Sequence, residues 1–151
     1  LSYNHHVNNK KTSINNIYDC GIILLNKDLN KILIVLQKRS QKWGLPKGHM
    51  EDNEKNNKQY FQCAKRELFE ETGIILTTIK YKKFGTIILN NKLFYLIQIL
   101  KDNKKITFPI DKNEIVLCKW IEINNINNFI KKNNCNKSIR DLYSKFMIQN
   151  N

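Results

Sequence analysis

Apolar residues in this chain gather in short runs, many of them β-branched, and polar turn residues separate the runs. Runs of this length and composition predict β-strands. The expected strands are 18–25, 31–37, 74–80, 84–89, 93–100 and 114–121. Asn90 and Asn91 lie between the expected strands 84–89 and 93–100. Asparagine tolerates positive φ, so the pair predicts a hairpin turn.

The spacing of apolar residues becomes helical from about residue 59 to residue 72, where Phe61, Ala64 and Leu68 share one side. Gly73 follows at the position where a helix-ending left-handed residue is expected. A second helical pattern covers 138–147, with Ile139, Leu142, Tyr143 and Phe146 on one face. Strands around a central helix, followed by a last helix, predict the α/β fold class.

The remaining segments are expected to be loops. Residues 43–48, with one proline and two glycines, predict a loop. The polar run 52–58 has no periodicity and predicts a loop that ends where the helix begins, near residue 57 or 58. We expect a flexible arm over residues 1–16 and one domain over 17–151. The Asn- and Lys-rich patch at 124–137 contains too much Ile and Phe to predict disorder.

Composition adds a partner class to this picture. The 151 residues are 41% hydrophobic, enough for one core, and carry a net charge of +13. Such a charge attracts polyanions such as nucleotides and RNA, although an A/T-rich genome would also enrich Lys and Asn. The four cysteines fit no zinc pattern and are expected to be free thiols. With no membrane-length apolar run and no visible signal peptide, we expect a soluble, cytoplasmic protein without a membrane partner.

The most informative chemistry lies at the end of the first helix. Glu67, Glu70 and Glu71 are spaced i, i+3 and i+4, which places three carboxylates on one helical face. Like charges this close repel one another, and they favour a bound cation. Carboxylate oxygens suit Mg²⁺ or Mn²⁺, which keep part of their water shell for a phosphate substrate. The pattern therefore predicts metal-dependent phosphate chemistry.

These residues lie in a longer stretch that resembles the Nudix box, G-x5-E-x7-R-E-U-x-E-E-x-G-U with U aliphatic. The first half is matched by Gly48 and Glu54. The second half is matched by Arg66, Glu67, Leu68, Glu70, Glu71, Gly73 and Ile74. The chain departs from the pattern in having eleven residues between Glu54 and Arg66. In one continuous helix these two residues would be roughly 18 Å apart, whereas an insertion that bulges before the helix lets Glu54 fold back to Arg66.

The resemblance implies a Nudix fold, in which a mixed β-sheet lies between helices and a loop–helix–loop box binds divalent metal. It implies that Glu67, Glu70 and Glu71 are metal ligands and that Arg66 contributes to catalysis by orienting them. Gly48, Glu54 and Gly73 would then be structural residues of the box, and Lys47 would bind substrate phosphates. The alternatives are a helix with solvated acids and a Nudix-fold protein without catalysis.

A second match lies downstream, where Asn113-Glu114-Ile115 and Trp120 resemble a segment of the mRNA-decapping subfamily. Dinucleoside tetraphosphate hydrolases carry a similar acid and Trp. This resemblance implies hydrolysis of a diphosphate linkage, with Glu71 or Glu114 as the base that activates water.

We expect the 5′ cap of mRNA as substrate and RNA as the partner. Dinucleoside or diphosphoinositol polyphosphates are alternatives, and so is an RNA-binding module without turnover; the oligomeric state is left open. The lysines expected to form an RNA track are Lys80, Lys82, Lys83, Lys104, Lys105, Lys131, Lys132 and Lys137.

Overall fold

The computed structural model of the chain describes residues 16–101 and 109–147, with side chains up to residue 145. Nearly all of the expected arm over 1–16 therefore lies outside the described residues, as do Lys104 and Lys105. The strands are β1 (Asp19–Leu25), β2 (Lys31–Gln37), β3 (Trp43–Gly44), β4 (Lys47–His49), β5 (Tyr81–Leu89), β6 (Lys92–Ile99) and β7 (Ile115–Glu122). The helices are α1 (Asp52–Asn56), α2 (Tyr60–Thr72), α3 (Ile126–Lys132) and α4 (Lys137–Leu142).

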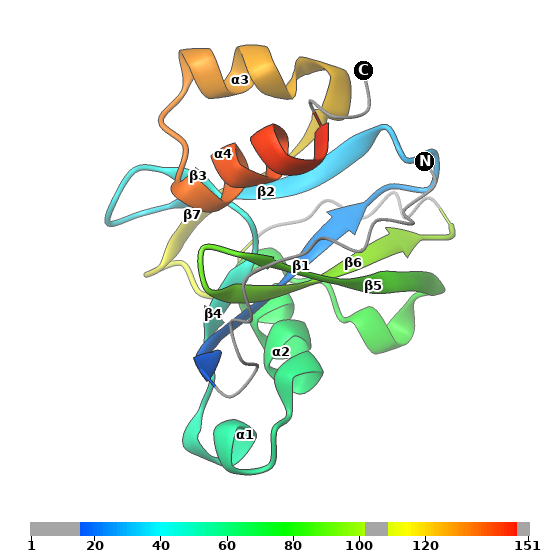
Figure 1. Cartoon of the computed structure of the whole chain (residues 1–151), viewed down its shortest axis with the longest axis vertical. Coiled ribbons are helices and arrows are strands. Elements are labelled where there is room, and N and C mark those ends of the chain that lie inside the picture. The colour runs from blue at the N-terminus through cyan, green and yellow to red at the C-terminus, as the bar shows by residue number, and fades with distance from the viewer. Residues whose placement is uncertain (1–15, 102–108, 148–151) are drawn as a thin grey trace.

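The strands form one mixed sheet (Figure 1). Its order is β3-β2-β1-β6-β5, with β4 paired to β1 and β7 paired to β2. The β1 and β6 strands run parallel, whereas the other pairs are antiparallel. The β5 strand lies at an edge of the sheet, and its central residues are exposed.

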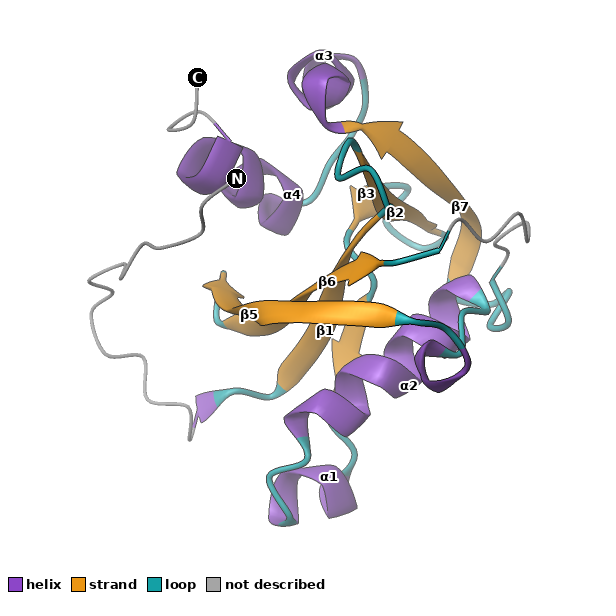
Figure 2. Ribbon diagram, turned by 90° about the vertical axis from the view of Figure 1, so that its right-hand side faces the viewer, coloured by secondary structure: helices purple, strands orange, loops and turns teal. Residues whose placement is uncertain are grey.

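Helices cover both faces of the sheet, with α2 on one side and α3 and α4 on the other (Figure 2). The alternation of side chains along β1 explains why both faces need cover. Ile22 and Leu24 enter the core beneath α2, whereas Ile23 and Leu25 enter the core beneath α4. This arrangement confirms the predicted α/β class with a mixed sheet between helices.

Two local predictions about chain reversals are confirmed. Asn90 and Asn91 adopt φ values of 50° and 58° between β5 and β6, as a tight hairpin turn requires. Gly73 has a φ of 75°, and its N–H donates to the Phe69 carbonyl at 2.8 Å. A left-handed glycine therefore ends α2, as its place after the helical pattern indicates.

The prediction of a strand over 74–80 is wrong. Leu76–Thr78 form a 3₁₀ turn instead, in which Leu76 is buried against the core beneath α2 and Ile75 is 49% exposed. The apolar run serves to anchor the chain after Gly73, and the strand itself begins at Tyr81. Tertiary packing thus overrides the β propensity of the segment.

The segment 43–48 is only partly a loop, because its two ends pair with the sheet. The β3 strand pairs with β2 and the β4 strand pairs with β1, while the Pro46 carbonyl accepts from Ile22 N–H at 3.1 Å. Proline interrupts the pairing because it has no N–H to donate. The β4 strand is thereby held beside α2, where it contributes to the site described below.

A helix that was not predicted, α3, crosses the Asn- and Lys-rich patch. Asparagine has a low helix propensity, so the sequence pattern is weak there. Tertiary contacts stabilise the helix: Ile126 is buried, and the Phe129 ring meets the Trp43 ring edge-on at 5.6 Å between centroids. The predicted C-terminal helix is confirmed as α4, which continues into a π-helical turn over Tyr143–Met147.

The lysines expected to form one RNA track do not share a face. Lys83 of β5 lies on the face of the sheet that α2 covers, whereas Lys82 points to the opposite face, and Lys131 and Lys132 end α3 over that opposite face. The four cysteines are free, as predicted. No helix in the described ranges combines the length and apolar character needed to cross a bilayer.

Candidate active site

Glu54 and its neighbours form a separate short helix, α1, and the chain between Glu54 and Arg66 breaks at 57–59 before α2 begins. The carboxylate-bearing helix was predicted to begin only near residue 57 or 58, and this is confirmed, since α2 starts at Tyr60. The prediction that residues 52–58 form a loop is wrong. A reciprocal capping box explains the helix: the Glu51 side chain receives the Glu54 N–H, and Glu54 accepts from Glu51 N–H at 2.8 Å. Lys58, with a φ of 54°, lies in the break between the two helices.

The break allows Glu54 to return to Arg66. The Arg66 guanidinium donates to Glu54 through Nη2 at 2.8 Å and through Nε at 3.3 Å, a two-point contact. Glu54 is only 3% exposed. Burial opposes its ionisation, yet the hydrogen bond and charge of Arg66 lower the pKa of Glu54, and hydrogen bonding to Glu54 raises the pKa of Arg66. The pair is therefore ionised on both sides.

Arg66 also holds the other carboxylates of the box. Its Nη1 donates to Glu67 at 2.9 Å and to both oxygens of Glu70 at 3.3 Å, and Nη2 donates to the His49 carbonyl of β4 at 2.9 Å. One guanidinium thus joins α1, α2 and β4. These contacts agree with the expected orienting role of Arg66.

The β4 strand lies directly against the carboxylate face of α2. A Cβ built on Gly48 would overlap the Glu67 carboxylate, so only glycine leaves room for that side chain. One residue earlier, Lys47 N–H donates to Glu71 Oε1 at 2.9 Å. The positive charge of Lys47 also acts on the same carboxyl group. Gly48 and Lys47 therefore fix the positions of two box carboxylates.

Burial makes two of these carboxylates difficult to ionise. Glu67 is 6% exposed and Glu71 is 1% exposed. Burial, opposed by Arg66 and reinforced by Glu70, raises the pKa of Glu67 to about 7. Burial raises the pKa of Glu71 to about 9, against the Lys47 hydrogen bond and with further repulsion from Glu67 and Glu114. Such groups remain charged at neutral pH when a cation accompanies them.

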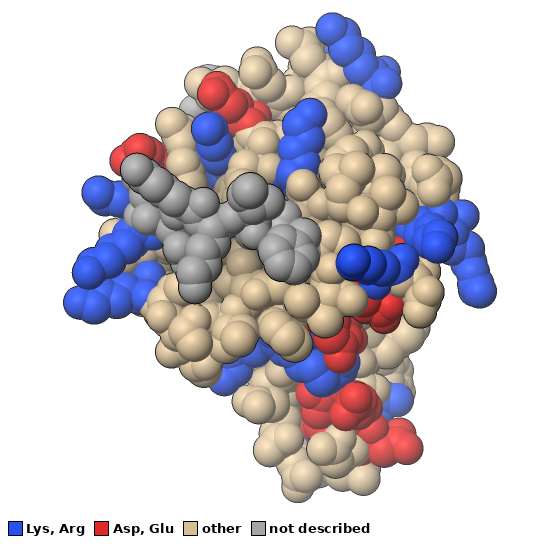
Figure 3. Space-filling view, turned by 180° about the vertical axis from the view of Figure 1, so that it is seen from behind, with Lys and Arg blue, Asp and Glu red and all other residues tan. Residues whose placement is uncertain are grey.

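The donor set fits a divalent metal. Acidic side chains gather over α1 and α2 in the lower part of Figure 3, although the chain as a whole has a net charge of +13. The carboxylate oxygens of Glu67, Glu70 and Glu71 are ligands that Mg²⁺ and Mn²⁺ accept. Among the residues that the structure describes, no three acidic, His or Cys side chains are close enough together to form a metal cage, and the Glu70 carboxylate accepts from Arg66 Nη1.

Glu114 lies on the loop directly before β7 and is exposed. Its negative charge acts on both Glu67 and Glu71, which places it at the same site. The loop is anchored to α2, because the N–H groups of Ile110 and Asp111 donate to the Glu70 carbonyl at 3.0 and 2.9 Å. The two sequence motifs, far apart along the chain, thus converge.

Two contributors were absent from the predicted site. Glu51 caps α1 and approaches Arg66 Nε at 3.8 Å. Its spacing of three residues before Glu54 is the spacing of a capping box, a signal that was available in the sequence. Cys118 of β7 donates from Sγ to the Glu71 carbonyl at 3.0 Å, and no sequence pattern marks this contact.

We expect Glu71→Gln to stabilise the protein when divalent cations are chelated. Because the folded-state pKa of Glu71 lies above its ordinary value of 4.5, ionisation costs more in the folded than in the unfolded chain. The loss of stability caused by ionising Glu71 is absent below pH 4.5 and grows as the pH rises toward about 9. Near neutral pH the variant should gain roughly 1–3 kcal/mol, and Mg²⁺ should stabilise it less than the parent.

Urea unfolding with chelator and with Mg²⁺ measures both effects, and Glu122→Gln, at an exposed position of β7, is the matched control. If Glu71→Gln is less stable than the parent in the presence of chelator, then burial of the Glu71 carboxylate does not lower the stability of the metal-free protein, and the prediction is wrong.

Comparison with known proteins gives the same family. The NUDIX domain model matches residues 17–143. The mRNA-decapping enzyme subunit 2 of Saccharomyces cerevisiae strain YJM789 is 28% identical over 116 residues, which cover 76% of this chain. The chain spans only 12% of the length of that relative. Putative hydrolase 111R of Invertebrate iridescent virus 3 is 41% identical over 70 residues, covering 46% of this chain and 38% of that protein.

Solved structures share the fold. RenU, a Nudix hydrolase from M. smegmatis, has a TM-score of 0.64 at 11% identity, with 89% of this chain and 86% of RenU covered. A C. elegans Ap4A hydrolase has a TM-score of 0.54 at 19% identity, with coverages of 76% and 84%. Because the family model spans most of the chain and the box residues meet in one site, the chain belongs to the Nudix hydrolase family.

Proposed function

We propose that this chain hydrolyses the diphosphate linkage of an mRNA 5′ cap with the help of Mg²⁺ or Mn²⁺, and releases a capped-nucleoside diphosphate. The observation that carries the hydrolytic part is the meeting of the box carboxylates with Glu114 and Lys47 around β4. These groups come from separate elements, so their meeting is a property of the fold rather than of helical spacing.

Glu67, Glu70 and Glu71 would hold the metal. When bound, the metal neutralises phosphate oxygens and favours loss of a proton from the attacking water. Glu114 takes that proton, because it is exposed and close enough to the buried acids to act on their pKa values. Glu71 is less suited to this step, since it is buried and one of its oxygens accepts from Lys47 N–H. The Lys47 ammonium offsets phosphate charge.

Likeness to decapping proteins supports the cap as substrate. A second S. cerevisiae relative, from strain S288c and described as an m7GpppN-mRNA hydrolase, is also 28% identical over 116 residues. The alternative is a dinucleoside polyphosphate, because hydrolases of that class carry a similar acid and Trp at the spacing of Glu114 and Trp120.

A substrate panel tests the proposal. We expect Mg²⁺- or Mn²⁺-dependent release of product from capped RNA, with much slower turnover of the cap dinucleotide, diadenosine tetraphosphate and diphosphoinositol pentakisphosphate. Capped RNA should be preferred because contacts to its phosphates add to binding, and its advantage should shrink as salt rises.

Three results would contradict the proposal. Equal cleavage of the cap dinucleotide and capped RNA at every salt concentration would favour a small-molecule hydrolase. Preferred cleavage of diadenosine tetraphosphate would favour the alternative substrate. RNA retained in EDTA, without product at any metal concentration, would identify an RNA-binding module without turnover.

A further inference from the structure

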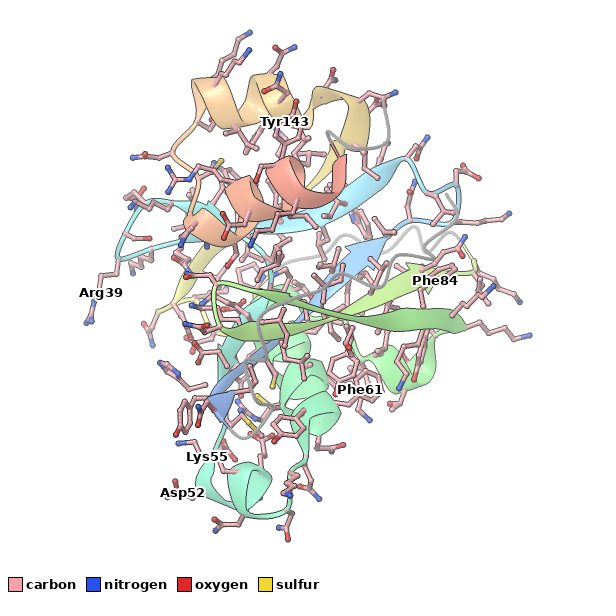
Figure 4. All side chains as sticks on the ribbon, in the orientation of Figure 1. Arg39, Asp52, Lys55, Phe61, Phe84 and Tyr143 are labelled. Carbon is pink, nitrogen blue, oxygen red and sulfur yellow. The ribbon has the colours of Figure 1, made fainter. Side chains whose placement is uncertain are left out.

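A group of lysine and aromatic side chains lies outside the carboxylate site, where α2 faces the sheet edge. We call it the lysine–aromatic cluster, and its members are Phe61, Lys65, Lys83 and Tyr95. Figure 4 shows one of its rings, that of Phe61, below β5. The members come from α2, β5 and β6, so the cluster exists only in the folded chain.

The rings hold the lysines close together. The Lys83 ammonium lies 4.4 Å from the Phe61 centroid and 5.5 Å from the Tyr95 centroid, and these two rings are 4.7 Å apart. The Lys65 ammonium lies 5.0 Å from the same Phe61 ring. Two ammonium groups are therefore gathered around one phenyl ring, although like charges repel.

Neither lysine of the cluster forms an ion pair within the described residues. The ion pairs of the described chain involve Arg66, His49 and Lys92, and none involves Lys65 or Lys83. Burial raises the pKa of Tyr95 to about 12, so its ring adds no negative charge. Lys83 is exposed and Lys65 is half-buried. The cluster is thus an accessible, positively charged site.

The edge strand shapes this surface. The pairing of β5 with β6 shifts register between Lys83 and Gly85, and Gly85 has a φ of 144° that other residues rarely adopt. A bulge at an edge redirects the side chains beside it and interrupts regular pairing with another strand. Lys83, which pairs with Ile97 of the core beneath α2, consequently faces solvent next to α2 and is open to a polyanion, whereas Lys82 points to the opposite face of the sheet.

Helical geometry relates the cluster to the carboxylate site. At about 100° per residue, Phe61 and Lys65 flank the buried face of α2 on one side, and Glu67 and Glu70 flank it on the other. A helix is about 10–12 Å wide, so a strand of a few nucleotides would reach across it. The cluster is therefore separate from the reacting groups but within reach of the same substrate.

We infer that the lysine–aromatic cluster binds phosphates of a single RNA strand whose 5′ end occupies the carboxylate site. The inference rests on the proposed function for the identity of the substrate. Paired ammonium groups suit the repeating phosphates of a nucleic acid strand, which a basic groove with aromatic side chains tracks without reading sequence.

Binding of uncapped RNA in chelator tests the cluster without any need for hydrolysis. A labelled single strand of about 20 nucleotides exceeds the roughly 4–16 that one basic groove covers. We expect K65A/K83A to weaken its affinity by roughly tenfold and to reduce the slope of log K against log salt by about 1.4. Phe61→Leu keeps every charge but loses the ring, and it should weaken affinity by roughly two- to fivefold.

The matched control is K131A/K132A, which removes the same charge from exposed positions of α3 on the other face of the sheet. It should change affinity much less than K65A/K83A. Equal losses from the two double variants would overturn the inference, because net charge alone would then explain binding. Competition by polyglutamate as effective as competition by RNA would overturn it too. Cap-dinucleotide turnover is measured separately, so failure of the proposed function is distinguished from failure of the cluster.

Discussion

Glu70→Gln and Glu71→Gln are each expected to lower kcat/KM for metal-dependent hydrolysis by roughly 10²–10⁴-fold while the fold survives. The substitution keeps the shape of the side chain but removes the charge that would hold a divalent cation. Because Glu71 is buried against Lys47 N–H, its amide replacement can still accept that hydrogen bond through Oε1. Steady-state hydrolysis with saturating Mg²⁺ or Mn²⁺ measures the effect.

The control for this loss is again Glu122→Gln, which removes a charge from an exposed residue at the end of β7. Circular dichroism and thermal unfolding show whether each variant is folded. Near-parental turnover in both box variants would remove Glu70 and Glu71 from the metal site, and with them the proposed mechanism.

Arg66→Met is expected to cause the largest loss of stability, roughly 3–5 kcal/mol. Glu54 is 3% exposed, and Arg66 is the cation bound to it at 2.8 Å. Removing the guanidinium leaves a buried carboxylate without its partner, and it also releases Glu67, Glu70 and the His49 carbonyl. Urea unfolding gives the change in the free energy of unfolding.

A second substitution separates the buried pair from the rest of the network. E54Q combined with R66M removes both charges of the pair, so it should recover part of the stability that R66M alone loses. A double variant as unstable as the sum of the two single variants would show that Glu54 and Arg66 act independently. That result would contradict the role assigned to the break between α1 and α2.

Local patterns explain why much of this molecule was predictable. The i, i+3, i+4 spacing of Glu67, Glu70 and Glu71 specifies one helical face regardless of what surrounds it. Gly73 and the Asn90–Asn91 turn depend on the φ preference of single residues. The apolar runs of β1 and β2 are buried on both faces and are therefore hydrophobic along most of their length.

Predictions failed where neighbours outweigh local preference. The run 74–80 has strand composition, but within the described residues it belongs to no strand, and Leu76 packs in a turn against the core beneath α2. The helix α3 has weak propensity and is stabilised by Ile126 in the core and by the contact of Phe129 with Trp43. Such outcomes depend on long-range packing, which periodicity does not report.

The sequence by itself determined the carboxylate-rich helix, its glycine cap and the family to which both point. Only the tertiary structure decided how the site is assembled: Glu54 returns to Arg66 through α1, Glu67 fits against Gly48, and Glu114 approaches from the loop before β7. These contacts join residues that are distant in sequence, and spacing along a chain carries no record of which surfaces meet. Burial at that meeting point, rather than residue type alone, also sets the raised pKa of Glu71.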